Sequence, residues 1–180
     1  TDDIKQLEQH YRQQHNIDSE SKLVLLHAGS GGSAINLSPE QFAALASQLS
    51  TLSLAHIILT AGPGEEETAK ALSDRMPDVP HSIYYSTEGL ESFSRFISIA
   101  DLFISGSTGP LHIAGALNIP IAAFYPARRS ATPLRWQTLS AQDRRLAFSP
   151  EKYSGDQDMQ TINIDDAAKQ INQFMNRLYS

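Results

Sequence analysis

The sequence predicts an α/β fold in which helices cover both faces of a doubly wound, mostly parallel β-sheet. Short apolar runs alternate with helical patterns along the chain, which is the order that right-handed βαβ units produce. Several of the runs are apolar at consecutive positions, as expected of strands that are covered on both faces. A length of 180 residues suits one such domain with its own core. We therefore expect residues 1–180 to form a single Rossmann-like domain.

Six apolar runs bounded by turn residues are the predicted strands. They cover Leu23–Ala28, His56–Thr60, Ser82–Tyr85, Leu102–Ser105, Ile119–Tyr125 and Leu146–Phe148. The predicted helices cover Asp2–Asn16, Pro39–Leu52, Glu65–Arg75, Leu90–Ile99, Pro110–Leu117 and Asp165–Leu178. Pro39–Leu52 has the most regular pattern, because its apolar residues recur at i, i+3, i+4 and i+7 and Ser38 is suited to cap it. We interpret residues 1–20 as a linker helix from an N-terminal domain that precedes this chain.

The composition excludes several classes of function. Fourteen Lys and Arg against twenty Asp and Glu give a net charge of −6, the opposite sign to that of most nucleic-acid-binding domains. The chain has no cysteine, and its six histidines show neither HxH nor HExxH spacing, so we expect no disulfide, no metal site and no cofactor. No apolar run is long enough for a transmembrane helix, and the first residues do not resemble a signal peptide. We expect a cytoplasmic protein.

Ligands of an open parallel sheet bind beyond the carboxyl ends of its strands, so the residues that follow each apolar run are the candidates. The loop after the first strand contains Ser30 and Gly31 within a Gly/Ser run, whose backbone can approach a phosphate closely. The alternative is a flexible connection without a ligand. Three consecutive acidic residues, Glu65–Glu67, begin the helix after the second strand. Most of them suit the positive end of the helix dipole, and one could accept hydrogen bonds from a ribose diol.

The turn after the fourth strand carries the most information. Ser107, Thr108 and Gly109 precede a helix that contains His112, and Pro110 suits its first position. The unpaired N–H groups at this helix start would face the crevice, where an anion or a diphosphate binds. The alternative is a capped core helix in which His112 is an ordinary polar residue. His27 ends the first strand, and we expect it to bond to the backbone rather than to a ligand.

The segment ADLFISGSTGPLHIAGALNIPIAAFYP resembles the C-terminal signature of the bacterial heptosyltransferases, glycosyltransferase family nine. HAGSGGSAINLSPEQFAALASQL and HIILTAGPGEEETAKAL resemble the two preceding units of that family, in the same order. The resemblance implies a GT-B fold, of which this chain is the C-terminal, donor-binding half. The family acts in lipopolysaccharide core synthesis, so the implied donor is ADP-heptose or a similar nucleotide sugar. The implied acceptor is the lipopolysaccharide core or lipid A, bound by the missing N-terminal domain at the periphery of the inner membrane.

The resemblance also implies roles for single residues. Ser30, Gly31 and the turn from Ser107 to Gly109 would face the donor diphosphate, with His112 one turn further into the helix. Glu65 would bind the adenosine ribose. Transfer would be direct and inverting, without a metal in the protein, and the catalytic base would lie in the missing domain, so this half alone would be inactive.

The chain departs from the family pattern at four positions. Many members have Lys and Trp where this chain has Ile35 and Leu37, Asp where it has Ser107, and Pro where it has Ala28. Loss of the Lys and the Asp removes charge-assisted contacts to phosphate and sugar, and so permits a different donor. Two alternatives therefore stay open. The chain is half of a UDP-sugar-using GT-B transferase or epimerase, or it is an α/β binding module that no longer binds the donor.

Overall fold

The computed structural model describes residues 1–29, 36–126, 142–150 and 159–180 of the chain. Within them, six strands form one parallel sheet in the order β3-β2-β1-β4-β5-β6. The strands are β1 (Lys22–His27), β2 (Ala55–Ala61), β3 (His81–Tyr85), β4 (Leu102–Gly106), β5 (Ile121–Phe124) and β6 (Arg145–Phe148). The order reverses between β1 and β4, which places the topological switch point of the sheet between the loops that follow these two strands.

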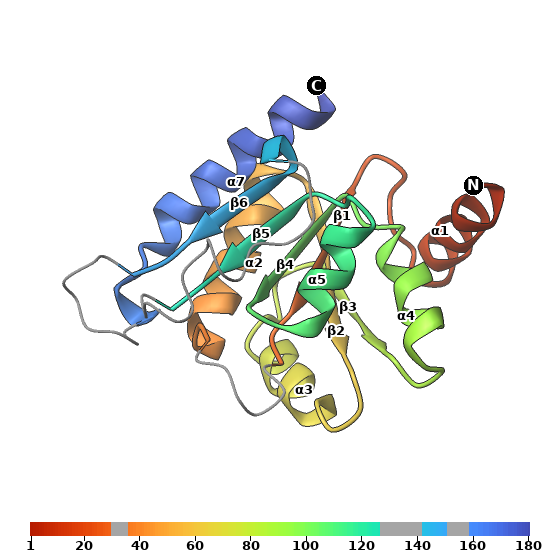
Figure 1. Ribbon diagram of the computed structural model, residues 1–180, viewed down its shortest axis with the longest axis horizontal. Helices are drawn as coiled ribbons and strands as arrows, with labels where there is room; N and C mark the ends of the chain where they lie inside the picture. The colour runs from red at the N-terminus through yellow and green to blue at the C-terminus, as the bar shows by residue number, and fades with distance from the viewer. Residues whose placement is uncertain (30–35, 127–141, 151–158) are drawn as a thin grey trace.

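Helices cover both faces of the sheet and make a three-layer sandwich (Figure 1). They are α1 (Asp2–Gln14), α2 (Pro39–Leu52), α3 (Glu66–Asp74), α4 (Leu90–Ile97), α5 (Gly109–Ala116) and α7 (Ile164–Tyr179), with short 3₁₀ turns η2 (Gln142–Arg144) and η3 (Met159–Thr161). The side chains of α2, α3 and α7 form one buried cluster with the sheet, and those of α1, α4 and α5 form a second cluster on the opposite face. The predicted doubly wound α/β fold is confirmed.

The sheet is buried on both faces, which explains why its sequence reads as continuous apolar runs. All seven residues of β2 and all five of β4 are buried. Parallel strands need such cover, because the crossover helices lie against both faces. The sequence also positions α2 as predicted: Ser38 and Gln41 form a reciprocal capping box, and its buried residues are those of the predicted apolar stripe.

Helix α1 is packed into the domain through its last turns. Tyr11 is buried, its ring contacts Phe96 of α4 edge-on, and its hydroxyl lies 2.7 Å from the Ser82 Oγ. The linker role that we expect for this segment stays a prediction. No helix in the described ranges is long and apolar enough to cross a bilayer.

Candidate functional site

A row of buried polar side chains crosses the carboxyl end of the sheet. Thr60, His27 and Ser105 are register partners on the neighbouring strands β2, β1 and β4, and at most 2% of each residue is exposed. Because register partners of parallel strands point to the same face, the three lie side by side under α4 and α5. The loops that follow these strands carry the residues predicted to bind ligand.

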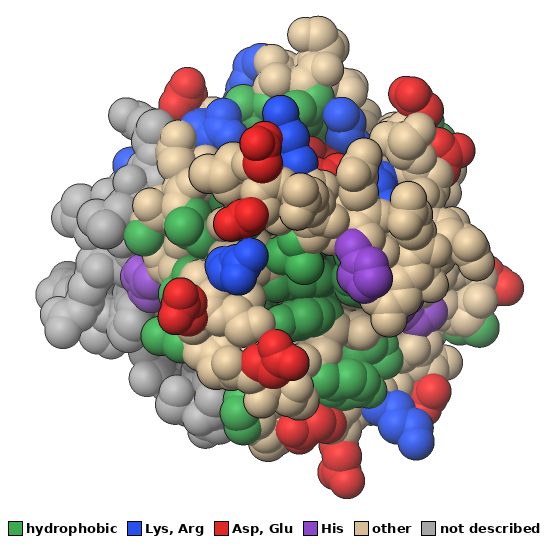
Figure 2. Space-filling view, turned by 90° about the vertical axis from the view of Figure 1, so that its right-hand side faces the viewer, with side chains coloured by type: hydrophobic (Ala, Val, Ile, Leu, Met, Phe, Trp, Pro, Cys, Tyr) green, Lys and Arg blue, Asp and Glu red, His purple; other side chains and the backbone are tan. Residues whose placement is uncertain are grey.

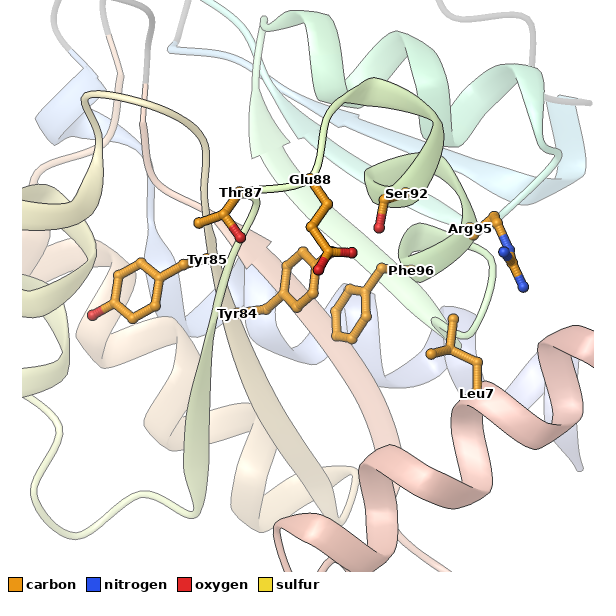
Figure 3. Close-up of a pocket in the computed structure, with 8 residues that line it drawn as sticks. All are labelled: Leu7, Tyr84, Tyr85, Thr87, Glu88, Ser92, Arg95 and Phe96. Carbon is orange, nitrogen blue, oxygen red and sulfur yellow. The ribbon is translucent and has the colours of Figure 1, made fainter.

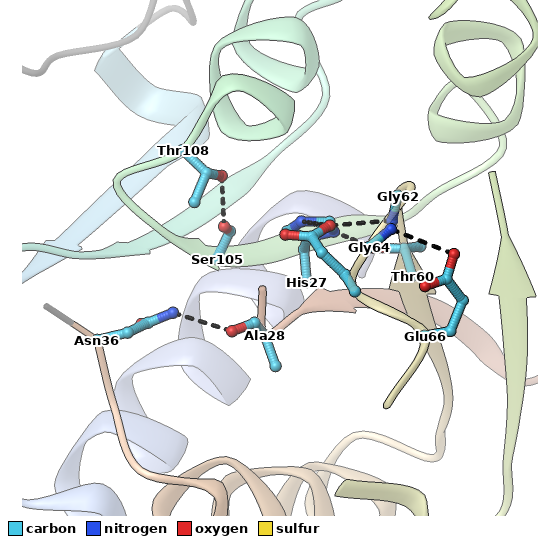
Figure 4. A network of polar contacts seen from close by, with 10 residues as sticks. His27, Ala28, Asn36, Thr60, Gly62, Gly64, Glu66, Ser105 and Thr108 are labelled. Atoms are coloured by element: carbon cyan, nitrogen blue, oxygen red, sulfur yellow. Dashed lines mark hydrogen bonds and ion pairs between the residues drawn. The ribbon is translucent and has the colours of Figure 1, made fainter. Parts of the chain in front are cut away.

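His27 joins the first two of these loops (Figure 4). Its Nδ1 lies 2.8 Å from the Thr60 Oγ1, and its Nε2 lies 3.1 Å from the Oε1 of Glu65. A carboxylate only accepts hydrogen bonds, so Nε2 carries the proton and the Thr60 hydroxyl donates to Nδ1 when the ring is neutral. The prediction that His27 bonds to the backbone is wrong, because two side chains at the strand ends come within reach of the ring.

Glu65 lies at the junction of the first two loops. It is the N-cap residue of α3, but its side chain makes no capping bond to that helix. Its Oε1 instead accepts a hydrogen bond from the Gly62 backbone N–H at 2.9 Å, in addition to the contact with His27. Its carboxylate also lies directly against Gly29, where a Cβ would come within 2.0 Å of Oε2. The acidic residue that was predicted for the ribose thus extends over the loop after β1.

The start of α5 lies on the other side of β1. Thr108 is the N-cap residue, and its Oγ1 pairs with the Ser105 Oγ at 2.9 Å instead of capping the helix. The Ser107 Oγ is buried and has no hydrogen-bond partner among the residues that the structure describes. Of the α-helices in the described part of the chain, α5 alone has no acidic residue in its first turn. The positive end of its dipole therefore faces no acidic side chain from its own first turn, as at helix ends that bind anions.

Asn36 lies between the end of β1 and the end of β4 and contacts both. Its Nδ2 donates to the Ala28 carbonyl at 3.2 Å, and its Oδ1 accepts from the Leu37 backbone N–H at 2.9 Å. A Cβ at Gly106 would lie 2.6 Å from Oδ1, so glycine is required there for this close approach. The sequence analysis missed Asn36, whose position after the Gly/Ser run was the only available signal.

The structure places four of the seven predicted site residues, Glu65, Ser107, Thr108 and Gly109, in the segments that follow β2 and β4 at the carboxyl end of the sheet. Gly109 is exposed, and no atom of a described residue lies within 4 Å of the position of its missing Cβ. His112 lies further along α5 and is half-buried. Ser30 and Gly31 lie outside the described residues, as does Ile35. Leu37, where many family members have Trp, is buried in the core under α2.

A cavity of about 400 Å³ lies away from these residues, between α1, the end of β3 and α4. Figure 3 shows the Glu88 carboxylate beside the rings of Tyr84 and Phe96, which stack with centroids 3.7 Å apart. On the face that includes α1 and α4, hydrophobic side chains gather at the centre, with acidic and basic ones around them (Figure 2). Among the described residues, no group of three His, Cys, Asp or Glu side chains could hold a metal ion.

Comparison with known proteins identifies the family. Residues 3–164 match the family described as glycosyltransferase family 9 (heptosyltransferase). A Haemophilus influenzae protein named "Putative glycosyltransferase" is 40% identical over 164 residues, which make up 91% of this chain and 47% of that protein. The chain belongs to glycosyltransferase family 9. It spans about half the length of this curated relative.

Solved structures of family members have the same fold. A family 9 glycosyltransferase from Veillonella parvula matches 97% of this chain and 52% of its own, with a TM-score of 0.77 and 15% identity. The E. coli ADP-heptose lipopolysaccharide heptosyltransferase II matches 96% of this chain and 52% of its own, with a TM-score of 0.75 and 18% identity. The E. coli heptosyltransferase WaaC with ADP gives a TM-score of 0.69 at 18% identity, over 93% of this chain and 48% of that one. This domain therefore has the fold of half of a GT-B enzyme.

Proposed function

We propose that this domain binds the nucleotide-sugar donor of a glycosyltransferase, and that the donor is ADP-heptose or a close analogue. Membership of family 9 supports a nucleotide-sugar donor. Two proteins of the same fold support the nucleotide and the sugar, since one carries ADP-heptose in its name and another was solved with ADP. By the same reasoning we propose that the acceptor is part of a lipopolysaccharide core and that the full-length protein meets it at the cytoplasmic side of the inner membrane.

The buried Ser107 hydroxyl at the start of α5 is the observation that carries the proposal. A buried polar atom without a partner costs about 1–3 kcal/mol, so a fold that retains one has a use for it. The hydroxyl lies beside a helix start that has no acidic residue and no side-chain cap. A diphosphate placed there would accept hydrogen bonds from the hydroxyl and from the N–H groups of the first turn, and the helix dipole would favour its charge.

Glu65 would recognise the other end of the nucleotide. Its carboxylate lies over Gly29, in the loop next to the start of α5, and it accepts hydrogen bonds. The two hydroxyls of a ribose are donors that suit a carboxylate, as at the strand ends of other nucleotide-binding sheets. A nucleoside diphosphate would then lie across the ends of β2, β1 and β4.

The proposed reaction is a direct, inverting transfer. An acceptor hydroxyl attacks the anomeric carbon as the bond from that carbon to the diphosphate oxygen breaks, and a base in the N-terminal half takes the proton. Negative charge grows on the departing diphosphate, where the N–H groups of α5 and the Ser107 hydroxyl would stabilise it. Because the proposed base belongs to the N-terminal half, we expect this domain alone to bind donor without transferring the sugar.

Calorimetric titration of the chain with ADP, UDP and GDP tests the proposal. We expect heat with ADP that is much reduced in a Ser107→Val variant, whose larger apolar side chain would occupy the phosphate position. Binding of UDP alone would instead favour a UDP-sugar transferase or an epimerase half. Failure of all three to bind would identify a module that no longer binds the donor.

A further inference from the structure

His27 is a buried histidine whose ring is contacted by aromatic and polar side chains. Its residue exposure is 1%, although it ends strand β1 at the carboxyl end of the sheet. The rings of Phe93 and Phe103 flank it, with centroids 6.3 and 6.5 Å from its own. Both ring nitrogens are bonded, to Thr60 and to Glu65. The imidazole therefore has one orientation, and its Nε2–H has one target.

We propose that His27 is a positioning residue that holds the Glu65 carboxylate in the orientation that reads the ribose diol of the nucleotide. The inference rests on the proposed function, because it assumes that Glu65 contacts the ribose. It goes beyond that function by assigning ribose specificity to a side chain that is itself too buried to touch the ligand. Thr60 contacts His27, and His27 in turn contacts Glu65, so His27 would act on the ligand only through Glu65.

The geometry of the carboxylate carries this assignment. The Oε1 of Glu65 accepts from two donors on different elements, the His27 Nε2 at 3.1 Å and the Gly62 N–H at 2.9 Å. Two donors to one oxygen fix the plane of the carboxylate, and Oε2 then lies over Gly29. Only 18% of the Glu65 side chain is exposed. Removal of His27 would take away one of these two donors and leave the position of Oε1 less constrained.

The positions of Thr60 and His27 on the sheet explain why the Glu65 carboxylate has a defined orientation. Thr60 and His27 are register partners on adjacent strands, so the distance between their side chains is set by the ladder of the sheet. Gly62 lies two residues beyond Thr60, on the same loop as Glu65. Groups on rigid strands thus place a flexible glutamate, which is the arrangement that precise ligand contacts need.

The first test compares the affinities of the chain for ADP and 2′-deoxy-ADP by calorimetry. We expect the wild type to bind ADP about tenfold more tightly, since a carboxylate loses a hydroxyl partner in the deoxy compound. His27→Phe keeps a planar ring but removes the donor, and should reduce this preference to about twofold or less. His27→Gln retains a side-chain N–H and should restore part of the preference. Ser82→Ala, which removes part-buried hydrogen bonds at the other end of the sheet, should leave the preference unchanged.

A second readout needs no nucleotide. The Gly62 amide donates to the carboxylate that His27 holds, so its hydrogen exchange by NMR should become about tenfold faster in His27→Phe, as in Glu65→Ala, and not in Ser82→Ala. Unchanged exchange, or an unchanged preference for ADP in a folded His27→Phe variant, would overturn the positioning role. If the wild type does not distinguish the two nucleotides, the ribose assignment of Glu65 fails, and with it this inference. If the wild type binds no nucleotide, the proposed function fails, while Gly62 exchange still decides whether His27 holds Glu65.

Discussion

The two ends of one face of the sheet each carry a buried histidine, yet the two histidines have different surroundings. At the amino end, the His56 Nε2 lies 3.0 Å from the Ser82 Oγ, which in turn lies 2.7 Å from the Tyr11 hydroxyl of α1. That network is closed, because its described members bond to one another beneath a helix. At the carboxyl end, His27 bonds to the Glu65 carboxylate, which lies over Gly29. In the described part of the chain, the Ser107 hydroxyl at this end has no partner.

This difference distinguishes polar groups that stabilise the fold from polar groups that are available to a ligand. A closed polar network stabilises the fold and has no bonding capacity left for a ligand. A network that ends on a carboxylate and an unpartnered hydroxyl costs stability until something else binds. Changes at the amino end should therefore alter stability without altering affinity. Changes at the carboxyl end should alter affinity, and removal of the Ser107 hydroxyl should also raise stability.

Gly29→Ala should give the largest effect of the variants considered, and this effect should be on the affinity for ADP. The new Cβ would lie 2.0 Å from the Glu65 Oε2, so the carboxylate must leave its position between His27 and Gly62. We expect ADP affinity to fall about 100-fold, as charge-assisted contacts are lost, while the melting temperature changes by a few degrees at most. Calorimetry and thermal melts of the same samples measure both quantities. Full retention of affinity would show that the ligand does not use this carboxylate.

Gly109→Ala is the matched control for that variant. No atom of the described residues lies within 4 Å of the Cβ it would add, so none of these residues has to move. A loss of ADP affinity in this variant would therefore show that the ligand lies close to the start of α5. We expect a loss of about tenfold. Equal affinities of Gly109→Ala and wild type would place the diphosphate away from the helix start.

The pKa of His56 predicts a pH effect on stability at the amino end of the sheet. Burial, followed by the positive charges of His15, His81 and Arg12, lowers its pKa from 6.5 to about 4. The unfolded chain takes up this proton near pH 6.5 and the folded protein only near pH 4. The contribution of neutral His56 to the free energy of unfolding should therefore be complete above pH 6.5 and decrease as the pH drops towards 4.

Urea unfolding at pH 7 and pH 5 measures this contribution. We expect His56 to account for a decrease of about 1–2 kcal/mol, less than the full shift would give because solvent and polar neighbours screen the site. His56→Phe should remove that part of the decrease, since His15, His81 and Arg12 remain in both proteins. An identical pH dependence of the two proteins would contradict the assigned pKa.

Two serine variants should change stability in opposite directions. Ser107→Ala removes a buried hydroxyl without a partner, so the free energy of unfolding should rise by about 1 kcal/mol while ADP affinity falls about tenfold. Ser82→Ala breaks the bonds to Tyr11 and His56, so stability should fall by about 1 kcal/mol at unchanged affinity. Urea unfolding and calorimetry of both variants test the pair. A stability change of the same sign in both would remove the distinction between the two ends.

The sequence predicted the elements well and their side-chain partners poorly. Local signals define α2, because its cap and its apolar stripe are both written in consecutive residues. The strand order explains why Glu65 and Ser107 approach the same crevice, and the rule for open sheets anticipated it. The bond from His27 to Glu65 depends instead on a contact between residues 38 positions apart, across the ends of two strands. Such a contact has no periodic signature, so the histidine was assigned to the backbone.

One sequence signal for this contact was available. Thr60, His27 and Ser105 are polar residues at or near the ends of otherwise apolar runs. In a parallel sheet with β2, β1 and β4 adjacent, three such ends form a row. Strand order was the missing information, since α/β chains of the same pattern can order their strands differently.

Glu66→Gln should give the smallest effect, and it separates two adjacent acids. The Glu66 Oε1 accepts from the Gly64 N–H at 3.2 Å on the exposed surface, away from His27. A neutral amide oxygen can still accept that bond, so we expect a loss of at most about 0.5 kcal/mol in stability, from the weaker interaction with the α3 dipole, and no change in ADP affinity. Glu65→Gln, measured beside it, should weaken ADP binding about tenfold. Equal effects of the two substitutions would mean that the acidic turn acts only through its charge, and that the orientation of Glu65 between His27 and Gly62 does not matter for binding.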